Sequence, residues 1–188
     1  MRKSYVASMK KSAKTSVMTC AVLVMTALIA CAHGAKSSTF NVHIENFGEV
    51  NEHYFRGSQP LGDNYAELAA MGVKTIVDLR DDALKNSQSL AEQAGLKYIN
   101  LPLSDKKYPA ADVAGRFLQI VNDKENWPVF VHCAGGRHRT GAMTAVYRMN
   151  VDGWKVDQAY AEMKQYDFYT AWGHGDLKKY VFDYDSQR

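Results

Sequence analysis

A seven-residue loop, 133–139, is the feature that most limits what this chain can fold into. A short apolar run, 128–131, precedes it, and a segment suited to a helix opens at Thr140. Short apolar runs of this kind are typical of a strand buried on both faces. Gly135 and Gly136 let the backbone curl, so that successive N–H groups point inward and the helix adds its positive end. The sequence therefore predicts a cradle for a phosphate-sized anion.

Two side chains of this loop carry chemistry. Arg139 offers a planar pair of donors for two phosphate oxygens. The positive field of the loop favours thiolate over thiol at Cys133, which makes this side chain a nucleophile at neutral pH. The chain has three cysteines, and Cys20 and Cys31 lie in or next to the N-terminal segment described below. Cys133 therefore stands alone in the folded part, and no disulfide framework is expected.

The rest of the chain alternates segments with strand and helix patterns. Its 188 residues, 46% hydrophobic and 23% charged, suit one domain with a buried core. Strands are predicted over 42–44, 54–56, 73–79, 98–101 and 128–131, and helices over 64–71, 87–94, 113–121, 142–150, 156–165 and 177–182. Asp63 is a predicted helix cap, Gly72 and Gly95 are predicted helix ends, and prolines bracket a loop over 102–109. Alternation of this kind indicates a layered α/β domain with a largely parallel central sheet.

The first thirty residues differ in composition from the remainder. They contain five basic residues and no acidic one, and 17–30 is almost wholly apolar, as in a secretory signal. A retained transmembrane helix is the weaker interpretation, because the apolar run is short. Leu28-Ile29-Ala30-Cys31 resembles a lipobox, which predicts lipidation and membrane anchoring through Cys31; ordinary signal cleavage is the alternative. We therefore expect a signal over 1–30, a flexible leader over 31–41, one domain over 42–188, and an exported protein that faces the periplasm.

The positive charge of the chain belongs to this signal. Without residues 1–30 the chain keeps 18 basic and 20 acidic residues, a formal charge of −2. Charge therefore gives no reason to expect nucleic acid or an anionic membrane surface as a partner.

The loop also resembles a known family. His132-Cys133, five residues, and Arg139-Thr140-Gly141 match the signature of the protein tyrosine phosphatase superfamily without a gap. Further matches are Arg56-Gly57-Ser58-Gln59-Pro60, the strand end Asp78-Leu79-Arg80, the loop around Asp105, and Tyr147-Arg148 followed by Gly153-Trp154. Over about 42–165 the chain resembles exported bacterial dual-specificity-type members, which are related to protein-tyrosine-phosphatase-like phytases. The resemblance implies a three-layer cysteine-phosphatase fold, with helices on both faces of a mostly parallel sheet.

The resemblance also implies a role for each residue of the site. Cys133 would attack phosphorus, Arg139 would stabilise the equatorial oxygens, and Asp105 would protonate the leaving oxygen and then activate water. Thr140 would stabilise the sulfur as it leaves, and His132 would orient the loop without touching substrate. The substrate's phosphate would be bound by Ala134, Gly135, Gly136, Arg137, His138 and Arg139. No metal and no cofactor is expected, because the loop already supplies a positive field.

Some assignments stay open. A loop aspartate between prolines is often only a turn residue, so Asp81, Asp82 and Asp112 remain alternatives to Asp105. On the rim of the loop, Arg137 and His138 would add positive charge where a second phosphate could bind. The other histidines show no ligand spacing and are interpreted as surface or packing residues; they are His33, His43, His53 and His174. Trp172, next to Gly173, could lie near the pocket.

These residues support three hypotheses. The first is an exported, monomeric phosphomonoesterase acting on phosphotyrosine, and also on phosphoserine or phosphothreonine, in proteins. The second keeps the enzyme and replaces its substrate by an inositol phosphate. The third is an inactive phosphate-binding module, against which the intact set Cys133, Arg139 and Asp105 argues. A sulfurtransferase of the rhodanese type also uses a loop cysteine, but such an enzyme has no need of His132 with Arg139-Thr140-Gly141.

Overall fold

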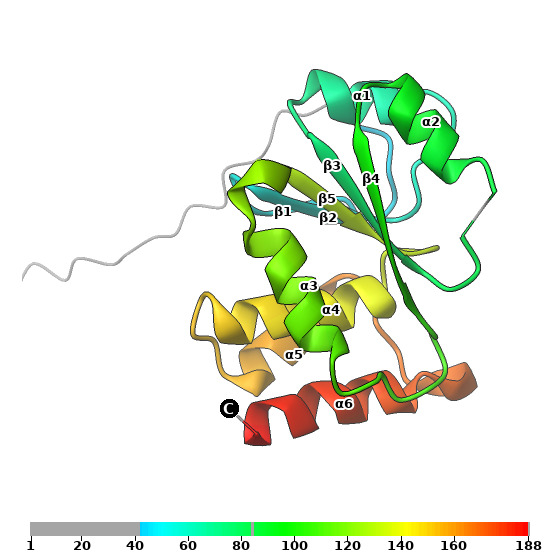
Figure 1. Ribbon diagram of the computed structural model, residues 1–188. Coiled ribbons are helices and arrows are strands. Elements are labelled where there is room, and N and C mark those ends of the chain that lie inside the picture. The colour runs from blue at the N-terminus through cyan, green and yellow to red at the C-terminus, as the bar shows by residue number, and fades with distance from the viewer. Residues whose placement is uncertain (1–41, 84, 188) are drawn as a thin grey trace, which may run out of the picture. The chain divides into compact units, whose positions relative to one another are not determined.

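A central β-sheet organises the computed structural model, which describes residues 42–83 and 85–187 (Figure 1). In these residues the sheet has five strands in the order β1-β2-β5-β3-β4. Strand β1 runs antiparallel to β2, and the other neighbours are parallel. The bounds are β1 Gly48–Asn51, β2 Tyr54–Gly57, β3 Thr75–Arg80, β4 Lys97–Leu103 and β5 Val129–His132. The predicted α/β class with a mostly parallel sheet is confirmed.

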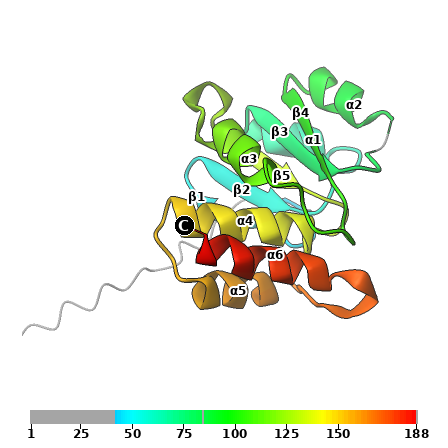
Figure 2. The same ribbon diagram turned by 60° about the horizontal axis from the view of Figure 1, so that its bottom comes forward.

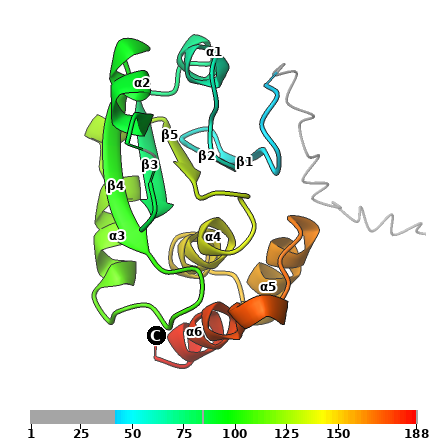
Figure 3. The same ribbon diagram turned by 90° about the vertical axis from the view of Figure 1, so that its right-hand side faces the viewer.

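Helices cover both faces of the sheet. Helices α1 (Asn64–Ala70) and α2 (Ser87–Gln93) lie on one face, where a first buried cluster includes Leu68 and Ala91. The second cluster, on the other face, includes residues of α3 (Val113–Asn122), α4 (Arg139–Asn150), α5 (Val156–Gln165) and α6 (Gly175–Ser186). Short 3-10 turns occur at η1 (Lys124–Asn126) and η2 (Ala171–Gly173). Figure 2 shows α4 next to the sheet with α5 and α6 packed beyond it, and Figure 3 shows α1 and α2 on the opposite side.

The two central strands are buried throughout. Every residue of β3 and of β5 is buried, and Ile76, Val77 and Phe130 have no exposed surface. β-Branched and aromatic side chains are suited to strands that are buried on both faces of a sheet. Because β2, β5, β3 and β4 are parallel, their carboxyl ends meet at one edge of the sheet. The loops that follow these strands therefore lie close together, and loop 133–138 is one of them.

Three details differ from the predictions. Residues 42–44 form no strand; Ile44 packs into the first cluster, and the chain turns at Asn46, which has φ +53°, before β1 begins. Strand β4 continues through Pro102 to Leu103, which is possible because β4 is an edge strand. Asp63 precedes α1 but its side chain makes no capping hydrogen bond.

Other local predictions are confirmed. Gly72 and Gly95 follow helix ends with φ +91° and +77°, where other residues would be strained. Helix α5 has the predicted bounds, and α4 begins at Arg139, one residue before the helix opening predicted at Thr140. The expected signal over 1–30, lipidation at Cys31 and leader over 31–41 lie outside the described residues and stay predictions. No helix in the described part of the chain is long and apolar enough to cross a bilayer.

A buried polar network holds β3 beneath the carboxyl edge of the sheet. The carboxylate of Asp78 accepts hydrogen bonds from Arg80 Nη2 (2.6 Å) and from the Tyr98 hydroxyl (2.8 Å). Arg80 also donates to Ser87 Oγ and to Gln59 Oε1. Burial alone would raise the pKa of Asp78, but the hydrogen bonds from Arg80 outweigh it and hold the pKa below its usual value. The network thus connects β3, β4, α2 and the segment after β2.

Asp78→Asn tests how far the fold depends on this network. The substitution leaves the buried Arg80 without its counter-ion, so we expect the free energy of unfolding to fall by about 3–5 kcal/mol. Urea unfolding at pH 7 measures the change. Asp112→Asn is the matched control, because it breaks an exposed ion pair with Arg116 and should cost less than ~1 kcal/mol. Equal losses in the two variants would contradict the assigned importance of the network.

Candidate active site

Loop 133–138 is held open by hydrogen bonds that its carbonyl groups accept from outside. Four successive carbonyls each have such a partner: Cys133 O with His132 Nδ1 (3.3 Å), Ala134 O with Gln59 N (3.1 Å), Gly135 O with Asn46 Nδ2 (2.8 Å), and Gly136 O with Arg56 Nη2 (2.5 Å). In a trans peptide the next N–H points opposite to the carbonyl. The N–H groups of residues 134–137 therefore face the inner side of the loop. They form a concave set of donors of the kind that binds anions.

Position 136 requires glycine for two structural reasons. Its φ is +67°, and a Cβ there would lie 2.6 Å from the Gly57 carbonyl carbon and 2.7 Å from the Ser58 nitrogen. The loop thus packs directly on the end of β2. Neither constraint applies to Gly135. Its φ is not positive, and a Cβ there would meet only the flexible side chain of Arg137, at 3.3 Å. The curl predicted from both glycines depends on Gly136.

Cys133 lies at the carboxyl end of β5 as a free, buried thiol. It lines a cavity of about 190 Å³. The remaining lining residues come from the loop, the segment after β4 and the segment before α6: Asp105, Ala134, Gly135, Arg137, His138, Arg139, Tyr169 and His174. The structure therefore brings Cys133, Asp105 and Arg139 together around one cavity.

Arg139 is anchored on one side and free on the other. Its Nη1 donates to Asp81 Oδ1 (2.8 Å), Asp82 Oδ1 (3.3 Å) and Leu103 O (3.3 Å). Its Nε is buried and has no hydrogen-bond partner in the described part of the chain. The free side of the guanidinium can therefore donate to an anion in the loop. Asp81 and Asp82, considered as alternative acids, contact Arg139 and do not line the cavity.

The remaining alternative acid, Asp112, is not among the residues of the cavity wall either. It lies before α3 and pairs with Arg116 at 3.5 Å. Asp105 lines the cavity, and its loop is fixed by the segment before α6. His174 Nδ1 donates to the backbone carbonyl of Asp105 (2.8 Å), and Gly173 packs on the Lys106 side chain.

His138 is neutral at pH 7. Its ring stacks on that of His174, with centroids 3.6 Å apart. Burial, together with the neighbouring His174, lowers the pKa of His138 to about 4. The positive charge predicted at this position is therefore absent. Burial likewise lowers the pKa of His132 to about 4, so both loop histidines are neutral at pH 7.

Arg137 has carboxylates on both sides. Its Nη2 lies 3.6 Å from Glu45 Oε2, and its Nε lies 3.7 Å from Asp167 Oδ2. These pairs are half exposed and loose, so they reduce the charge at the rim without removing it. Within the loop and helix α4, Thr140 Oγ1 is fully buried and has no hydrogen-bond partner in the described residues.

Sequence reasoning missed two residues of the wall, Tyr169 and His174. Both come from the segment between α5 and α6, in which Trp172 has φ +61° and an exposed side chain. His174, interpreted as a surface or packing residue, does pack: its ring stacks on that of His138 and forms part of the cavity wall. The sequence feature that could have indicated this part of the wall is the group of aromatic residues before Gly173 and Gly175, Tyr169 and Trp172.

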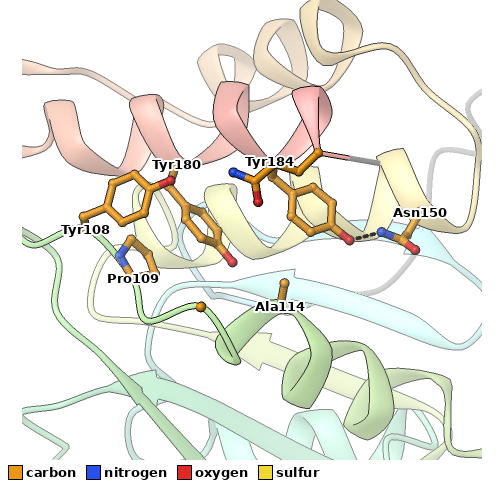
Figure 4. A pocket seen from close by; sticks show the side chains of 8 residues that line it. Tyr108, Pro109, Ala114, Asn150, Tyr180 and Tyr184 are labelled. Atoms are coloured by element: carbon orange, nitrogen blue, oxygen red, sulfur yellow. Dashed lines mark hydrogen bonds between the residues drawn. The ribbon is translucent and has the colours of Figure 1, made fainter.

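A larger cavity of about 800 Å³ lies between the Asp105 loop, α3 and α6 (Figure 4). Its wall contains the rings of Tyr108, Tyr180 and Tyr184 and none of residues 133–139. Tyr108 packs edge-on against Tyr180, and its hydroxyl donates to Asp183 Oδ2 (2.8 Å). This cavity shares no lining residue with the one that Cys133 lines and is therefore separate from it. Over residues 42–83 and 85–187, no group of three or more His, Cys, Asp or Glu side chains could hold a metal ion.

Comparisons with known proteins agree on one family. Residues 34–174 match the family described as DSP-PTPase phosphatase fused to NAD+ kinase. Dual specificity protein phosphatase TpbA of Pseudomonas aeruginosa is 28% identical over 137 residues, 72% of this chain and 61% of TpbA. Inositol diphosphatase DSP2 of Oryza sativa is 28% identical over 126 residues, 64% of this chain and 61% of DSP2. The chain thus spans about three fifths of the length of these curated relatives.

Solved structures share the fold. A crystal structure of a TpbA variant in complex with phosphotyrosine has a TM-score of 0.64 at 28% identity and covers 76% of this chain and 88% of that one. The core catalytic domain of the PP-IP phosphatase SIW14 from S. cerevisiae, in complex with citrate, has a TM-score of 0.67 and covers 76% of this chain and 87% of that one. At 23% identity, the second likeness concerns the fold alone.

Gly136→Ala tests whether the loop requires this backbone geometry. The new Cβ would collide with Gly57 and would force alanine to a positive φ, so the cradle has to distort. We expect affinity for inorganic phosphate, measured by calorimetry, to fall by at least about tenfold, since loss of one charge-assisted donor has that scale. Gly135→Ala is the matched control and should stay within about threefold of the unsubstituted protein. Equal affinities in the two variants would contradict the assigned geometry.

Proposed function

The chain belongs to the DSP-PTPase family of phosphatases, and we propose that it hydrolyses phosphotyrosine monoesters through a covalent cysteinyl-phosphate intermediate. One observation carries the proposal: the four carbonyls of residues 133–136 are bonded outward, and a free thiol, Cys133, lines the cavity that the loop borders. An anion seated there would receive several N–H groups and the unpartnered side of Arg139. These donors are the kind that stabilise charge developing on transferred phosphoryl oxygens.

The proposed reaction has two displacements at phosphorus. In the first, the Cys133 thiolate attacks, an S–P bond forms and the bond from phosphorus to the tyrosine oxygen breaks. Asp105 gives its proton to that oxygen. In the second, water gives a proton to the Asp105 carboxylate and attacks phosphorus, the S–P bond breaks, and phosphate and thiolate are released.

The supporting residues have distinct parts in this scheme. The backbone N–H groups of the loop and Arg139 bind the phosphoryl oxygens in both steps. Thr140, whose buried hydroxyl is unpartnered in the described residues, would donate to the sulfur as it leaves. His132 donates from Nδ1 to the Cys133 carbonyl and would keep the loop oriented without touching substrate. His174 would hold the Asp105 loop through its backbone carbonyl.

Phosphotyrosine is the substrate we favour for two reasons. A TpbA variant that is 28% identical has been solved in complex with phosphotyrosine. The cavity wall of this chain carries Tyr169, which is 42% exposed and packs edge-on against His138 and His174. Such an aromatic surface suits a phenyl ring.

A second candidate substrate is an inositol polyphosphate. Curated relatives are named inositol diphosphatases, and Arg137 lies at the rim, where a second phosphate could bind. The local charge favours it less, because Arg137 faces Glu45 and Asp167 and because His138 is neutral. We therefore propose phosphotyrosine first and the inositol polyphosphate as the alternative.

The proposed acid can be tested with two phosphate esters. We expect Asp105→Asn to lower kcat for a phosphotyrosine peptide by about 10²–10³-fold, the scale of general acid catalysis. The loss should be much smaller for p-nitrophenyl phosphate, because its leaving group is far more acidic than tyrosine and needs little protonation. Phosphate release from both esters measures the effect, with Cys133→Ser as the blank.

Two further variants serve as controls for this test. Asp81→Asn, which weakens the anchor of Arg139, should slow both esters by the same factor, and Asp112→Asn should change neither. If Asp105→Asn slows both esters equally, Asp105 is not the acid. If the unsubstituted protein binds both esters and cleaves neither, the chain is an inactive binding module and the proposed reaction is wrong.

The charge at the rim can be tested separately. In the double variant Glu45→Gln, Asp167→Asn, Arg137 loses both carboxylate neighbours, so kcat/KM for an inositol polyphosphate should rise by about two- to tenfold, as expected for two exposed ion pairs. The value for p-nitrophenyl phosphate should not change. The measurement is phosphate release at low and high salt, since the gain should shrink as salt screens the charges. An unchanged value for the inositol polyphosphate at low salt would show that the rim charge does not select the substrate.

A further inference from the structure

Arg56 is a fully buried arginine behind the loop. It belongs to β2, and its side chain has no exposed surface. Nη2 donates to the Gly136 carbonyl (2.5 Å), and the guanidinium carbon lies 3.8 Å from the centroid of the Tyr166 ring. Nε and Nη1 have no hydrogen-bond partner in the described part of the chain. Two of its three nitrogens are thus left unsatisfied in a buried position.

This guanidinium also lacks a counter-ion, unlike the other buried arginines. Arg80 pairs with Asp78 and Arg139 with Asp81. The partly buried Arg148 also has carboxylate partners, Glu162 and Asp152. Within residues 42–83 and 85–187, no carboxylate oxygen lies within 4 Å of an Arg56 nitrogen. A buried charge is costly unless an anion compensates for it. Arginine does not escape this cost by losing its proton, because guanidinium stays charged in proteins.

The groups near Arg56 show which anion could compensate. Burial lowers the pKa of Arg56, and the groups that oppose this shift are Tyr54, Tyr166, Glu162 and Cys133. Burial raises the pKa of Tyr54, so its hydroxyl carries no charge at pH 7. Tyr166 contacts the guanidinium through the face of its ring. Glu162 is already held by Arg148, with Oε1 2.7 Å from Nη2. The anions left to compensate for Arg56 are a thiolate at Cys133 and a phosphate in the loop.

Arg56 can act on the interior of the loop through the peptide group to which it is hydrogen-bonded. The guanidinium bonds to the outer side of the peptide between Gly136 and Arg137. The N–H of that peptide points to the inner side, where the anion would lie. A cation on the carbonyl polarises the peptide and makes this N–H a stronger donor.

We propose that Arg56 is a positioning residue whose buried charge, acting from behind the loop through the Gly136 carbonyl, stabilises the Cys133 thiolate and the bound phosphate. The inference rests on the proposed function of Cys133 as a nucleophile. Arg56 touches neither substrate nor sulfur in this scheme. The charge of Arg56, and not merely its hydrogen bond, is what the loop requires.

A pair of substitutions separates charge from hydrogen bonding. Arg56→Gln keeps a side-chain N–H that can donate to Gly136 O and removes the charge. Arg56→Lys keeps the positive charge and replaces the planar guanidinium by an ammonium group. Both leave unchanged the other charged or titratable groups that face Cys133 or Arg56: Asp105, His132, Arg137, His138, Arg139, Tyr169, His174, Tyr54, Tyr166 and Glu162.

The experiment measures the alkylation of Cys133 by iodoacetamide in the full chain from pH 5.5 to 9.5. Mass spectrometry of the Cys133 peptide gives the rate constant, and Cys133→Ser is the blank. At pH 6 we expect Arg56→Gln to react at least about tenfold more slowly than the unsubstituted protein. Removal of a nearby buried charge changes the stability of a thiolate on that scale. At pH 9.5, which lies above the ordinary pKa of a free cysteine, the two rates should agree within about twofold.

Two more variants complete the design. Arg56→Lys should stay within about threefold of the unsubstituted protein at pH 6, because the charge remains. Arg116→Gln is the control; it removes an arginine that pairs with Asp112, neither residue lines the cavity, and the profile should therefore be unchanged. Protection of Cys133 by inorganic phosphate at pH 7 should need about tenfold more phosphate in Arg56→Gln, because the same buried charge attracts the bound anion.

Two outcomes would overturn the proposal. One is an Arg56→Gln profile that equals the unsubstituted one, and the other is a rate that falls by the same factor at pH 6 and pH 9.5, as a purely structural role would produce. If Arg56→Gln does not fold, Arg56→Lys decides by the same comparison: equal loss at both pH values overturns the proposal. The assay uses no phosphate ester, so inactivity of the unsubstituted protein would contradict the proposed function and leave this result intact.

Discussion

The outward hydrogen bonding of four loop carbonyls is the interaction on which the site depends. A peptide chain that turns its carbonyls into a cavity would repel an anion, whereas this loop turns its N–H groups there. The donors come from separate parts of the chain: His132 at the end of β5, Gln59 after β2, Asn46 before β1 and Arg56 within β2. The cradle therefore exists only when the sheet has formed around it. Folding and site formation are the same event for these residues.

The sheet meets this requirement through its parallel order. Strand β5 lies between β2 and β3, so the ends of both neighbours border the loop. From β2 come a close backbone surface against Gly136 and the side chain of Arg56. From β3 come the Asp78 network below the loop and Asp81, which anchors Arg139. Both neighbouring strands thus hold the loop in place, and little rearrangement of its backbone is needed when an anion binds.

The sequence predicted the loop, Cys133, Arg139 and most strands and helices because these depend on neighbours in the chain. Residues 42–44 were mistaken for a strand, since alternation cannot tell a paired strand from an extended segment that packs Ile44 into a core. Arg56 and His174 were visible as residues, but their roles depend on contacts 80 and 69 positions away. The charge of His138 was predicted wrongly for a related reason. Burial of the ring, together with the stacked His174 from the segment before α6, lowers its pKa, and no local pattern reveals either effect.

The distribution of charge bears on what the site can select. At the rim, Arg137 lies between two carboxylates and His138 is neutral, so the positive potential there is weak. Inside, the unpartnered side of Arg139, the N–H groups and the uncompensated Arg56 all act on one position. Such a site gains most of its binding free energy from one phosphate and gains little from a second. In the function proposed above, discrimination among monophosphates would rest on the aromatic wall formed by Tyr169 and His174, which suits a substrate with a ring next to its phosphate.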